Sequence, residues 1–204
     1  MSELNGSAPD RASSVLVIVD VVNDLEFDGG EALLANALPM ARELAALKAA
    51  AKRCGVQVVY VNDNFGRWRS DFRSHVRHCL EDGVRGQPIA TLLRPDEDDY
   101  FVLKPRHSGF YETPLQLLLH HLDARTLVLT GMAGNLCVLA TAHDAHTRGY
   151  RLVVPADCVA SVSRDDNAQA LRHCARWLGA DVRKWRGLDL EALAREAPRP
   201  ALTA

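Results

Sequence analysis

Three residues with complementary chemistry stand at the ends of apolar stretches of this sequence. Asp20 closes the run VLVIVD, Lys104 closes YFVLK, and Cys137 follows the small-residue segment GMAGNL. A carboxylate can accept and return a proton, an ammonium group can stabilise nearby negative charge, and a thiolate is a strong nucleophile. If folding brings these three side chains together, they can form a covalent intermediate with a carbonyl substrate.

The expected surroundings of each residue favour such a meeting. An aspartate beside buried valines is costly unless it is paired, so a cationic partner is expected, and Lys104 is the candidate. A cysteine near a helix N-terminus and an ammonium group should have a lowered thiol pKa. We therefore expect Cys137 to attack as a thiolate, Asp20 to shuttle its proton, and backbone N–H groups from 133 to 137 to face the developing oxyanion. Taken singly, the aspartate also suits a helix cap, the lysine a solvated surface and the cysteine simple packing.

The predicted strands and helices explain how these residues could meet. Apolar runs predict strands at 15–22, 56–62, 100–103, 126–130 and 151–154, with a short sixth strand over 180–184. Helices are predicted at 31–53, 76–81, from 114 onward, at 137–148 and at 163–178. This alternation is typical of right-handed crossovers, so we predict a three-layer α/β/α sandwich with a mainly parallel, Rossmann-like six-stranded sheet. Ligands gather at the carboxyl ends of such strands, where Asp20 and Lys104 stand.

The composition is that of an ordinary globular domain. The chain has 204 residues, 48% of them hydrophobic, and its 24 basic against 26 acidic residues give a formal charge of −2. We therefore expect no nucleic-acid partner, and the lack of an apolar run of about 20 residues predicts no membrane partner and a cytoplasmic location. The five cysteines are an odd number without a C-x-x-C pair, so neither a disulfide framework nor a zinc site is expected. We predict a flexible segment over 1–14, a single domain over 15–196 and a loose tail over 197–204.

Residues that follow the strand ends are candidates for substrate binding. We predict this role for Asn23, Phe27, Phe65 and Trp68. Arg67 and Arg69 suit either a substrate carboxylate or a subunit interface, because arginine and aromatic residues are favoured in both.

Several histidines have spacings that could chelate a metal or reach the site. These are His143 with His146, the group His75, His78 and Cys79, and His107 close behind Lys104. A helix surface is the favoured interpretation of the first two sets, so no metal and no cofactor are expected. His107 could reach the pocket, although Ser108 and Gly109 beside it favour a loop-shaping role.

The segments around Asp20, Lys104 and Cys137 resemble those of the isochorismatase-like cysteine hydrolases. The resemblance is carried by VLVIVDVVND, LKPRHSGFYETPL and TGMAGNLCVLATAHDAHTRGY, of which the last is the most specific, and it spans about 15–161. It implies an Asp-Lys-Cys triad, a thioester intermediate opened by water that Asp20 activates, and hydrolysis of a C–N bond in a small amide, carbamoyl or ureido substrate. It also implies a cis peptide between Met132 and Ala133 that turns backbone amides toward the oxyanion. A homo-oligomer, dimer or tetramer, is expected.

Two departures within that family bear on the substrate. Nicotinamidases carry an Asp-x-His metal motif after the second strand, whereas this chain has Asp63-Asn64-Phe65, so metal-dependent nicotinamide binding is not expected. Isochorismatases proper cleave a vinyl ether without a thiol nucleophile, so Cys137 favours amide chemistry. Two alternatives stay open: an ether hydrolase in which Asp20 protonates the substrate, and a catalytically silent binding or assembly protein on the same fold.

Overall fold

The strands form one parallel sheet in the order β3-β2-β1-β4-β5, with β6 beside β4. The computed structural model describes residues 11–64 and 71–195. The strands in these residues are β1 (Ser14–Val19), β2 (Gln57–Asp63), β3 (Tyr100–Lys104), β4 (Thr126–Met132), β5 (Arg151–Val153) and β6 (Val159–Ala160). Each pairing between them is parallel, as the alternation of strands and helices predicts.

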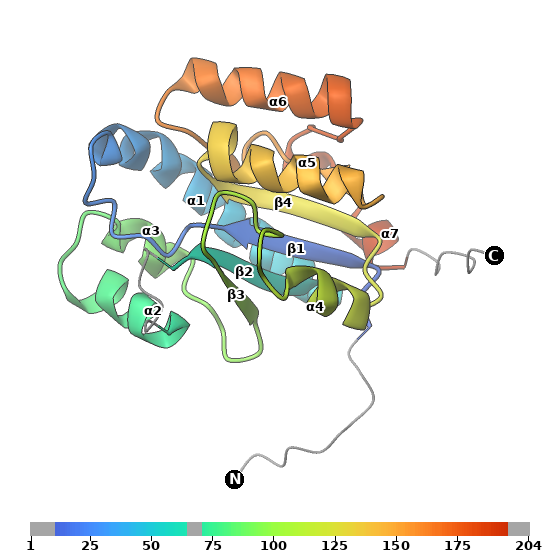
Figure 1. Cartoon of the computed structure of the whole chain (residues 1–204), viewed down its shortest axis with the longest axis horizontal. Helices are drawn as coiled ribbons and strands as arrows, with labels where there is room; N and C mark the ends of the chain where they lie inside the picture. Colours follow the sequence, from blue (N-terminus) through green and yellow to red (C-terminus); the bar gives the residue numbers. More distant parts are fainter. Residues whose placement is uncertain (1–10, 65–70, 196–204) are drawn as a thin grey trace, which may run out of the picture.

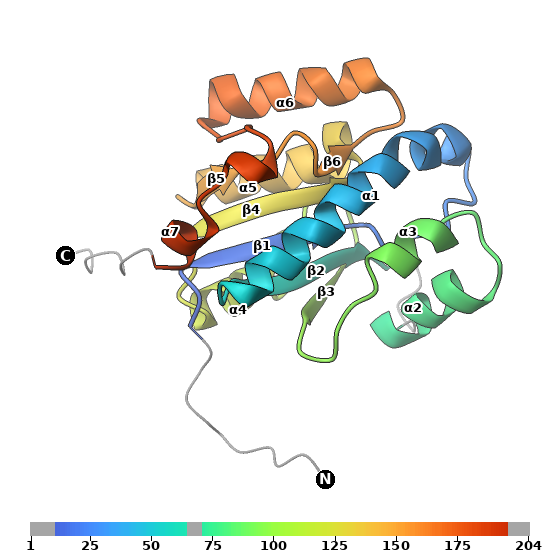
Figure 2. The ribbon, with the colours of Figure 1, turned by 180° about the vertical axis from the view of Figure 1, so that it is seen from behind.

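Helices cover both faces of the sheet (Figures 1 and 2). They are α1 (Gly30–Arg53), α2 (Phe72–Glu81), α3 (Gln87–Leu92), α4 (Leu115–His121), α5 (Leu139–Thr147), α6 (Arg164–Leu178) and α7 (Leu190–Ala194), with a π-helical turn η1 (Gly134–Val138) and a 3₁₀ turn η2 (Trp185–Gly187). One core cluster joins the sheet to α1, α2, α3 and α7, and a second joins it to α4, α5 and α6. The three-layer α/β/α sandwich is therefore confirmed.

Strand β1 is the centre of the sheet and is buried on both faces. Leu16 and Ile18 pack in the cluster beneath α1, whereas Val15, Val17 and Val19 pack in the opposite cluster. All five side chains are fully buried. This double burial explains why the sequence here is a continuous β-branched run instead of an alternating one.

Several helix ends follow the expected local chemistry. Helix α1 ends at Cys54 and Gly55, where Gly55 has a φ of +80°, a conformation that glycine adopts readily. The Ser163 hydroxyl accepts hydrogen bonds from the backbone N–H groups of Asp165 and Asp166 and thereby caps α6. Helix α4 begins at Leu115, one residue later than expected, with Pro114 at its cap.

The sixth strand was predicted in the wrong place. Residues 180–184 contain only a one-residue bridge, in which Asp181 pairs with Val153. The chain bends away immediately, because the Asp181 carboxylate accepts a hydrogen bond from the backbone N–H of Arg183. The sixth strand is instead β6 (Val159–Ala160), which pairs with the last residues of β4, beyond the end of the short β5.

The described end of the predicted N-terminal segment packs against the domain: Ala12 is buried, and its N–H donates to the carbonyl of Leu122. Ser14 belongs to β1, where it is buried and pairs with Thr126, so it is not part of a flexible segment. Its hydroxyl donates to the carbonyl of Leu193, which ties β1 to α7. The remainder of the predicted N-terminal segment and the predicted C-terminal tail lie largely outside the described residues. No helix in the described ranges is long and apolar enough to cross a membrane.

Candidate active site

The carboxyl ends of β1, β3 and β4 bring Asp20, Lys104 and Cys137 together. Asp20 follows β1 directly, Lys104 is the last residue of β3, and Cys137 lies in η1 after β4. Strand β2 separates β1 from β3, so the long lysine side chain must reach past the end of β2. That end is Asp63, which pairs in register with Lys104.

Lys104 contacts both other residues. Its Nζ lies 2.8 Å from Oδ2 of Asp20 and donates a hydrogen bond to Sγ of Cys137 across 3.5 Å. The Asp20 carboxylate is also close enough to Cys137 to raise the pKa of its thiol. Lys104 is fully buried, and Asp20 and Cys137 are 6% and 8% exposed. The three groups therefore form a water-poor cluster in which each charge has a partner.

Backbone contacts hold Asp20 in an unusual conformation. Its φ is 53°, in the left-handed region that aspartate tolerates better than most residues. Its N–H donates to the carbonyl of Val61 across 3.0 Å, and its Oδ1 accepts from the N–H of Asp63 across 2.7 Å. Asn62 is fully buried. Its side-chain amide accepts from the N–H of Val22, two residues after Asp20, and donates to the carbonyl of Val22. The end of β2 therefore positions the segment that follows β1.

The turn before Cys137 depends on close approach to β1. Gly131 has a φ of +104°, and a Cβ there would lie 2.1 Å from the carbonyl oxygen of Val19. The peptide bond between Met132 and Ala133 is cis. Within the segment expected to face the oxyanion, two N–H groups are already used: Asn135 donates to the Ser161 hydroxyl and Leu136 to the Ala133 carbonyl. Those two are therefore excluded as donors to a substrate.

Thr141 links the nucleophile segment to the loop that follows Lys104. Its Oγ1 donates to the carbonyl of Cys137 across 2.7 Å and accepts from the N–H of Gly109 across 2.9 Å. One turn further along α5, Asp144 accepts a hydrogen bond from the hydroxyl of Ser108. The loop after β3 and the turn that carries Cys137 are thus fastened to the same helix.

The electrostatics correct one expectation about the thiol. Burial raises the pKa of Cys137 to about 12; the Asp20 carboxylate adds to that rise and Lys104 opposes it. The resting cysteine is therefore a thiol, not the thiolate expected from the helix terminus and the ammonium group. Burial also raises the pKa of Asp20 against the opposing effect of Lys104. Burial acts to lower the pKa of Lys104, but the charges of Asp20, Cys137 and Asp63 outweigh it and the pKa is raised, so the lysine stays charged.

The structure describes two of the four residues predicted to bind substrate, Asn23 and Phe27. Phe27 is 45% exposed and its side chain is open to solvent. Asn23 is half-buried, and its Oδ1 accepts from the N–H of Leu25, which makes it an Asx-turn residue. Phe65, Trp68 and the two arginines of that loop lie outside the described residues.

Two further side chains adjoin the cluster. Asp63 Oδ2 lies 3.6 Å from Nζ of Lys104, a contact that the strand register explains but the sequence analysis did not anticipate. Nδ1 of His107 lies 3.9 Å from Sγ of Cys137, so this histidine does reach the site. Its position three residues after a strand-ending lysine was the available signal.

His75, His78 and Cys79 do not form a three-ligand group in the described part of the chain. The ring of His143 packs against His173 at 4.8 Å, and His78 pairs with Asp82 at 2.7 Å. The group close enough to hold one ion there is Asp96, Asp98 and Asp99.

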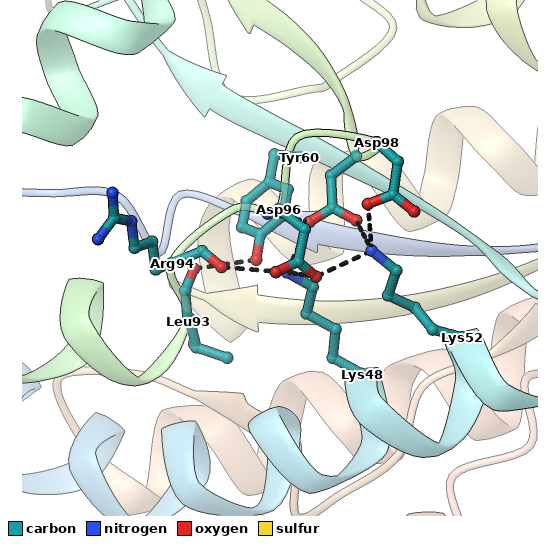
Figure 3. A network of polar contacts seen from close by, with 8 residues as sticks. Lys48, Lys52, Tyr60, Leu93, Arg94, Asp96 and Asp98 are labelled. Carbon is teal, nitrogen blue, oxygen red and sulfur yellow. Dashed lines mark hydrogen bonds and ion pairs between the residues drawn. The ribbon is translucent and has the colours of Figure 1, made fainter.

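Lysines already neutralise that acidic group (Figure 3). Nζ of Lys52 lies 2.8 Å from Asp96, 2.6 Å from Asp98 and 3.0 Å from Asp99, and Lys48 pairs with Asp96 and Asp99 as well. This network fastens α1 to the start of β3, at the opposite end of the strand from Lys104. We interpret this group as a set of structural ion pairs and not as a metal site.

A groove lined by described residues lies elsewhere. It has a volume of about 770 Å³ and runs between α2 and the segment that leads into β3, beside Phe72, Arg77, Arg94 and Phe101. No residue of the Asp20, Lys104 and Cys137 cluster lines it. The cluster is identified by its chemistry and not by the size of a cavity.

The other cysteines have ordinary packing roles or partial exposure. All five are free thiols; Cys79, Cys158 and Cys174 are buried like Cys137, whereas Cys54 is half-exposed. Three of the four cysteines other than Cys137 are therefore buried.

Comparison with known proteins identifies the family of this chain. The family model described as Isochorismatase domain matches residues 14–186. The chain is 40% identical over 172 residues to the isochorismatase family protein YaaI of Bacillus subtilis, covering 84% of this chain and 94% of that protein. It is 31% identical over 176 residues to the ureidoacrylate amidohydrolase RutB of Methylorubrum extorquens, covering 72% of this chain and 70% of the relative.

Solved structures show the same fold. N-carbamoylsarcosine amidase from Thermoplasma acidophilum superposes with a TM-score of 0.65 at 29% identity, covering 87% of this chain and 99% of that one. The nicotinamidase PncA from Bacillus subtilis superposes with a TM-score of 0.66 at 26% identity, covering 84% and 99%. With a family model that spans most of its length, this chain belongs to the isochorismatase family.

Proposed function

We propose that this protein is a cysteine-dependent hydrolase that cleaves a C–N bond of a small amide, carbamoyl or ureido compound. The observation that carries the proposal is the position of Lys104, whose Nζ is 2.8 Å from Asp20 and 3.5 Å from Cys137. One ammonium group can thus stabilise negative charge on the carboxylate and on the sulfur in turn. That is the electrostatic requirement for passing a proton between them.

The first half of the reaction starts from a neutral thiol. As Sγ of Cys137 attacks the substrate carbonyl carbon, its proton passes to Asp20, and the developing sulfur charge is stabilised by Lys104. The raised pKa of Asp20 supports this role, because it brings the pKa of the carboxyl closer to that of the thiol. The same proton then passes from Asp20 to the substrate nitrogen as the C–N bond breaks, which leaves a thioester.

Backbone N–H groups of Ala133 and Cys137 are the proposed donors to the oxyanion. Asn135 and Leu136 donate within the protein, so they are excluded from the segment considered. Met132 precedes Ala133 across the cis peptide bond. Such donors act best in a dry site, and the low exposure of Cys137 provides one.

The substrate class rests on the nucleophile and on the relatives. RutB is named for ureidoacrylate and the Thermoplasma protein for N-carbamoylsarcosine, and both names describe C–N cleavage next to a carbamoyl carbon. Phe65 stands in the sequence where the Asp-x-His metal motif of nicotinamidases has its histidine, and the register places Asp63, the first residue of that stretch, against Lys104. We therefore favour carbamoyl and ureido acids over nicotinamide.

The proposal is tested with Cys137→Ala on a panel of small primary amides, ureido acids and carbamoyl compounds, with ammonia release as the readout. The variant should be folded and inactive, and intact mass of the wild type should show an acyl adduct on Cys137. Cys54→Ala, at a half-exposed cysteine outside the site, serves as the matched control and should keep full activity.

Two results would replace this proposal. Cleavage of an isochorismate-type vinyl ether by Cys137→Ala at the wild-type rate would favour the ether hydrolase in which Asp20 is the proton donor. A wild type that binds members of the panel without turnover or adduct would favour a binding protein on the same fold.

We also propose that the protein acts as a homo-oligomer. Large apolar side chains are exposed on separate elements: Phe101 is 51%, Leu117 73% and Trp177 64% exposed. Light scattering on a size-exclusion column, with single aspartate substitutions at these positions, measures the stoichiometry and identifies the face that is buried.

A further inference from the structure

Ser161 contacts the turn that carries the nucleophile. Its side chain is fully buried, and its Oγ accepts a hydrogen bond from the backbone N–H of Asn135 across 3.1 Å. Asn135 lies in η1, two residues before Cys137 and two after Ala133. The contact therefore fixes one N–H of the segment in which the N–H groups of Ala133 and Cys137 are the proposed oxyanion donors.

Asn167 of α6 orients the Ser161 hydroxyl. The hydroxyl donates to Oδ1 of Asn167 across 3.0 Å, and Nδ2 of Asn167 donates to the carbonyl of Val159 across 3.1 Å. A serine hydroxyl has one proton and two lone pairs, so donating the proton to Asn167 leaves the oxygen to accept from Asn135. Three hydrogen bonds thus run in one direction, from the Asn135 N–H to the Val159 carbonyl.

Neighbouring elements hold this chain of hydrogen bonds in place. Val159 belongs to β6 and pairs in register with Gly131 near the end of β4. Asn36 of α1 donates from its side-chain amide to the carbonyl of Ser161 across 3.2 Å. Contacts from β4, α1 and α6 therefore converge on the residue that holds η1.

Gly134 shows how closely the turn packs on these side chains. A Cβ at Gly134 would clash with Oδ1 of Asn167 and would lie 3.0 Å from Oγ of Ser161. The backbone of the turn therefore lies directly against the two polar groups. A shift of either group would displace that backbone, and a displacement of about 1 Å can cost about 10²-fold in rate.

We propose that Ser161 is a positioning residue for the oxyanion donors and that Asn167 sets the orientation of its hydroxyl. This inference rests on the cysteine mechanism proposed above. The ion pair of Asp20 and Lys104 governs the reactivity of the sulfur, whereas Ser161 governs where the backbone N–H groups meet the substrate oxygen. Because the Ser161 side chain is fully buried, it acts through the backbone and not on the substrate.

Two small reagents measure these two functions separately. Propanal adds reversibly to Cys137: the sulfur bonds to the carbonyl carbon, and the thiol proton passes to the carbonyl oxygen, which lies where the oxyanion of a tetrahedral intermediate forms. Methyl methanethiosulfonate converts the thiol to a mixed disulfide and releases methanesulfinic acid, so no oxyanion forms on carbon. Protection of Cys137 from the second reagent gives the dissociation constant of propanal, and modification without propanal gives the reactivity of the thiol.

The variants are Ser161→Ala, Asn167→Ala and the double variant. Peptide-resolved mass spectrometry measures the modification of Cys137, and circular dichroism measures folding. Ser163→Ala is the matched control, because the Ser163 hydroxyl also accepts from backbone N–H groups, but from those of α6 instead of η1.

Ser161→Ala should raise the dissociation constant of propanal by about 10-fold, which is less than the roughly 10²–10³-fold cost of losing a direct oxyanion donor. Asn167→Ala should raise it similarly, and the double variant should raise it no further, because both substitutions break the same chain of hydrogen bonds. The rate of modification without propanal should stay at the wild-type value in every variant. Ser163→Ala should keep the wild-type dissociation constant.

Other results overturn the inference. An unchanged dissociation constant in Ser161→Ala removes this residue from the positioning of the donors. An equal rise in Ser163→Ala assigns the effect to loosening of α6, and a parallel fall in the rate of thiol modification assigns it to the sulfur. A wild type that propanal does not protect contradicts the proposed addition of Cys137 to a carbonyl carbon, and the wild type alone reveals that failure, which distinguishes it from a failure of Ser161.

Discussion

Replacing Lys104 with methionine tests the energetic basis of the whole site. Lys104 is fully buried with its Nζ 2.8 Å from Oδ2 of Asp20, which is itself 6% exposed. Methionine keeps an apolar side chain of similar length but removes the charge. The substitution therefore leaves a buried carboxylate whose cationic partner is gone.

Two estimates give the size of the effect. At an effective dielectric constant of 20, unit charges at this separation attract each other by about 6 kcal/mol. Asp20 can avoid part of that loss by taking up a proton, which at pH 7 costs about 4.4 kcal/mol for a carboxyl with its ordinary pKa of 3.8. We expect Lys104→Met to lower the free energy of unfolding by about 3–5 kcal/mol, the usual cost of breaking a buried ion pair.

The pH dependence distinguishes this cause from lost packing. Burial already raises the pKa of Asp20 in the folded protein, and loss of Lys104 removes the opposing effect. A group with a raised folded-state pKa contributes stability that is complete below its unfolded pKa of 3.8 and is lost as pH rises through the folded value. The deficit of Lys104→Met relative to wild type should thus shrink as pH falls from 7 to 5, by up to about 2.7 kcal/mol.

Urea unfolding of wild type and variant at pH 7 and pH 5 measures both quantities. Lys184→Met, at an exposed lysine before η2, is the control and should change the free energy of unfolding by less than about 0.5 kcal/mol at either pH. A Lys104→Met deficit below about 1 kcal/mol would refute the buried-pair reasoning, given the usual cost of breaking such a pair. A deficit above that value would also refute it if the deficit were equal at pH 7 and pH 5.

Two further predictions concern the thiol and its support. Asp20→Asn removes a carboxylate that helps raise the pKa of Cys137, so alkylation of Cys137 by iodoacetamide at a fixed pH between 8 and 10 should become faster. Peptide-resolved mass spectrometry measures the rate. An unchanged or slower rate would contradict the electrostatic account. Thr141→Val deletes the hydroxyl that bonds Gly109 and the Cys137 carbonyl, which should lower the free energy of unfolding by about 1–3 kcal/mol. Thr141→Ser keeps the hydroxyl and removes the methyl group, so it should lose less. Equal losses in the two variants would contradict this account, because the hydroxyl would then contribute no more than the methyl group.

The layered fold was predictable because its signals are local. A β-branched run such as 15–19 indicates a strand buried on both faces, and Ser163 ahead of two aspartates indicates a helix start. Short elements were missed because they are too short to carry such a local signal. Helices α3 and α7 have only six and five residues, too few for a periodic pattern, and β6 has two.

Residue type and position along the chain were sufficient to nominate Asp20, Lys104 and Cys137, because a parallel sheet delivers its strand ends to one edge. Their protonation was decided by the tertiary structure. The helix terminus and the lysine predict a lowered thiol pKa, yet burial and the neighbouring carboxylate raise it to about 12. The position of His107 beside the sulfur likewise depends on the bonds of its two neighbours: the Arg106 carbonyl accepts from Lys104, and the Ser108 hydroxyl donates to Asp144, which lies far along the chain. Desolvation and close contact arise only when distant segments pack together, so the sequence determined which groups are present and the folded structure determined their charges and partners.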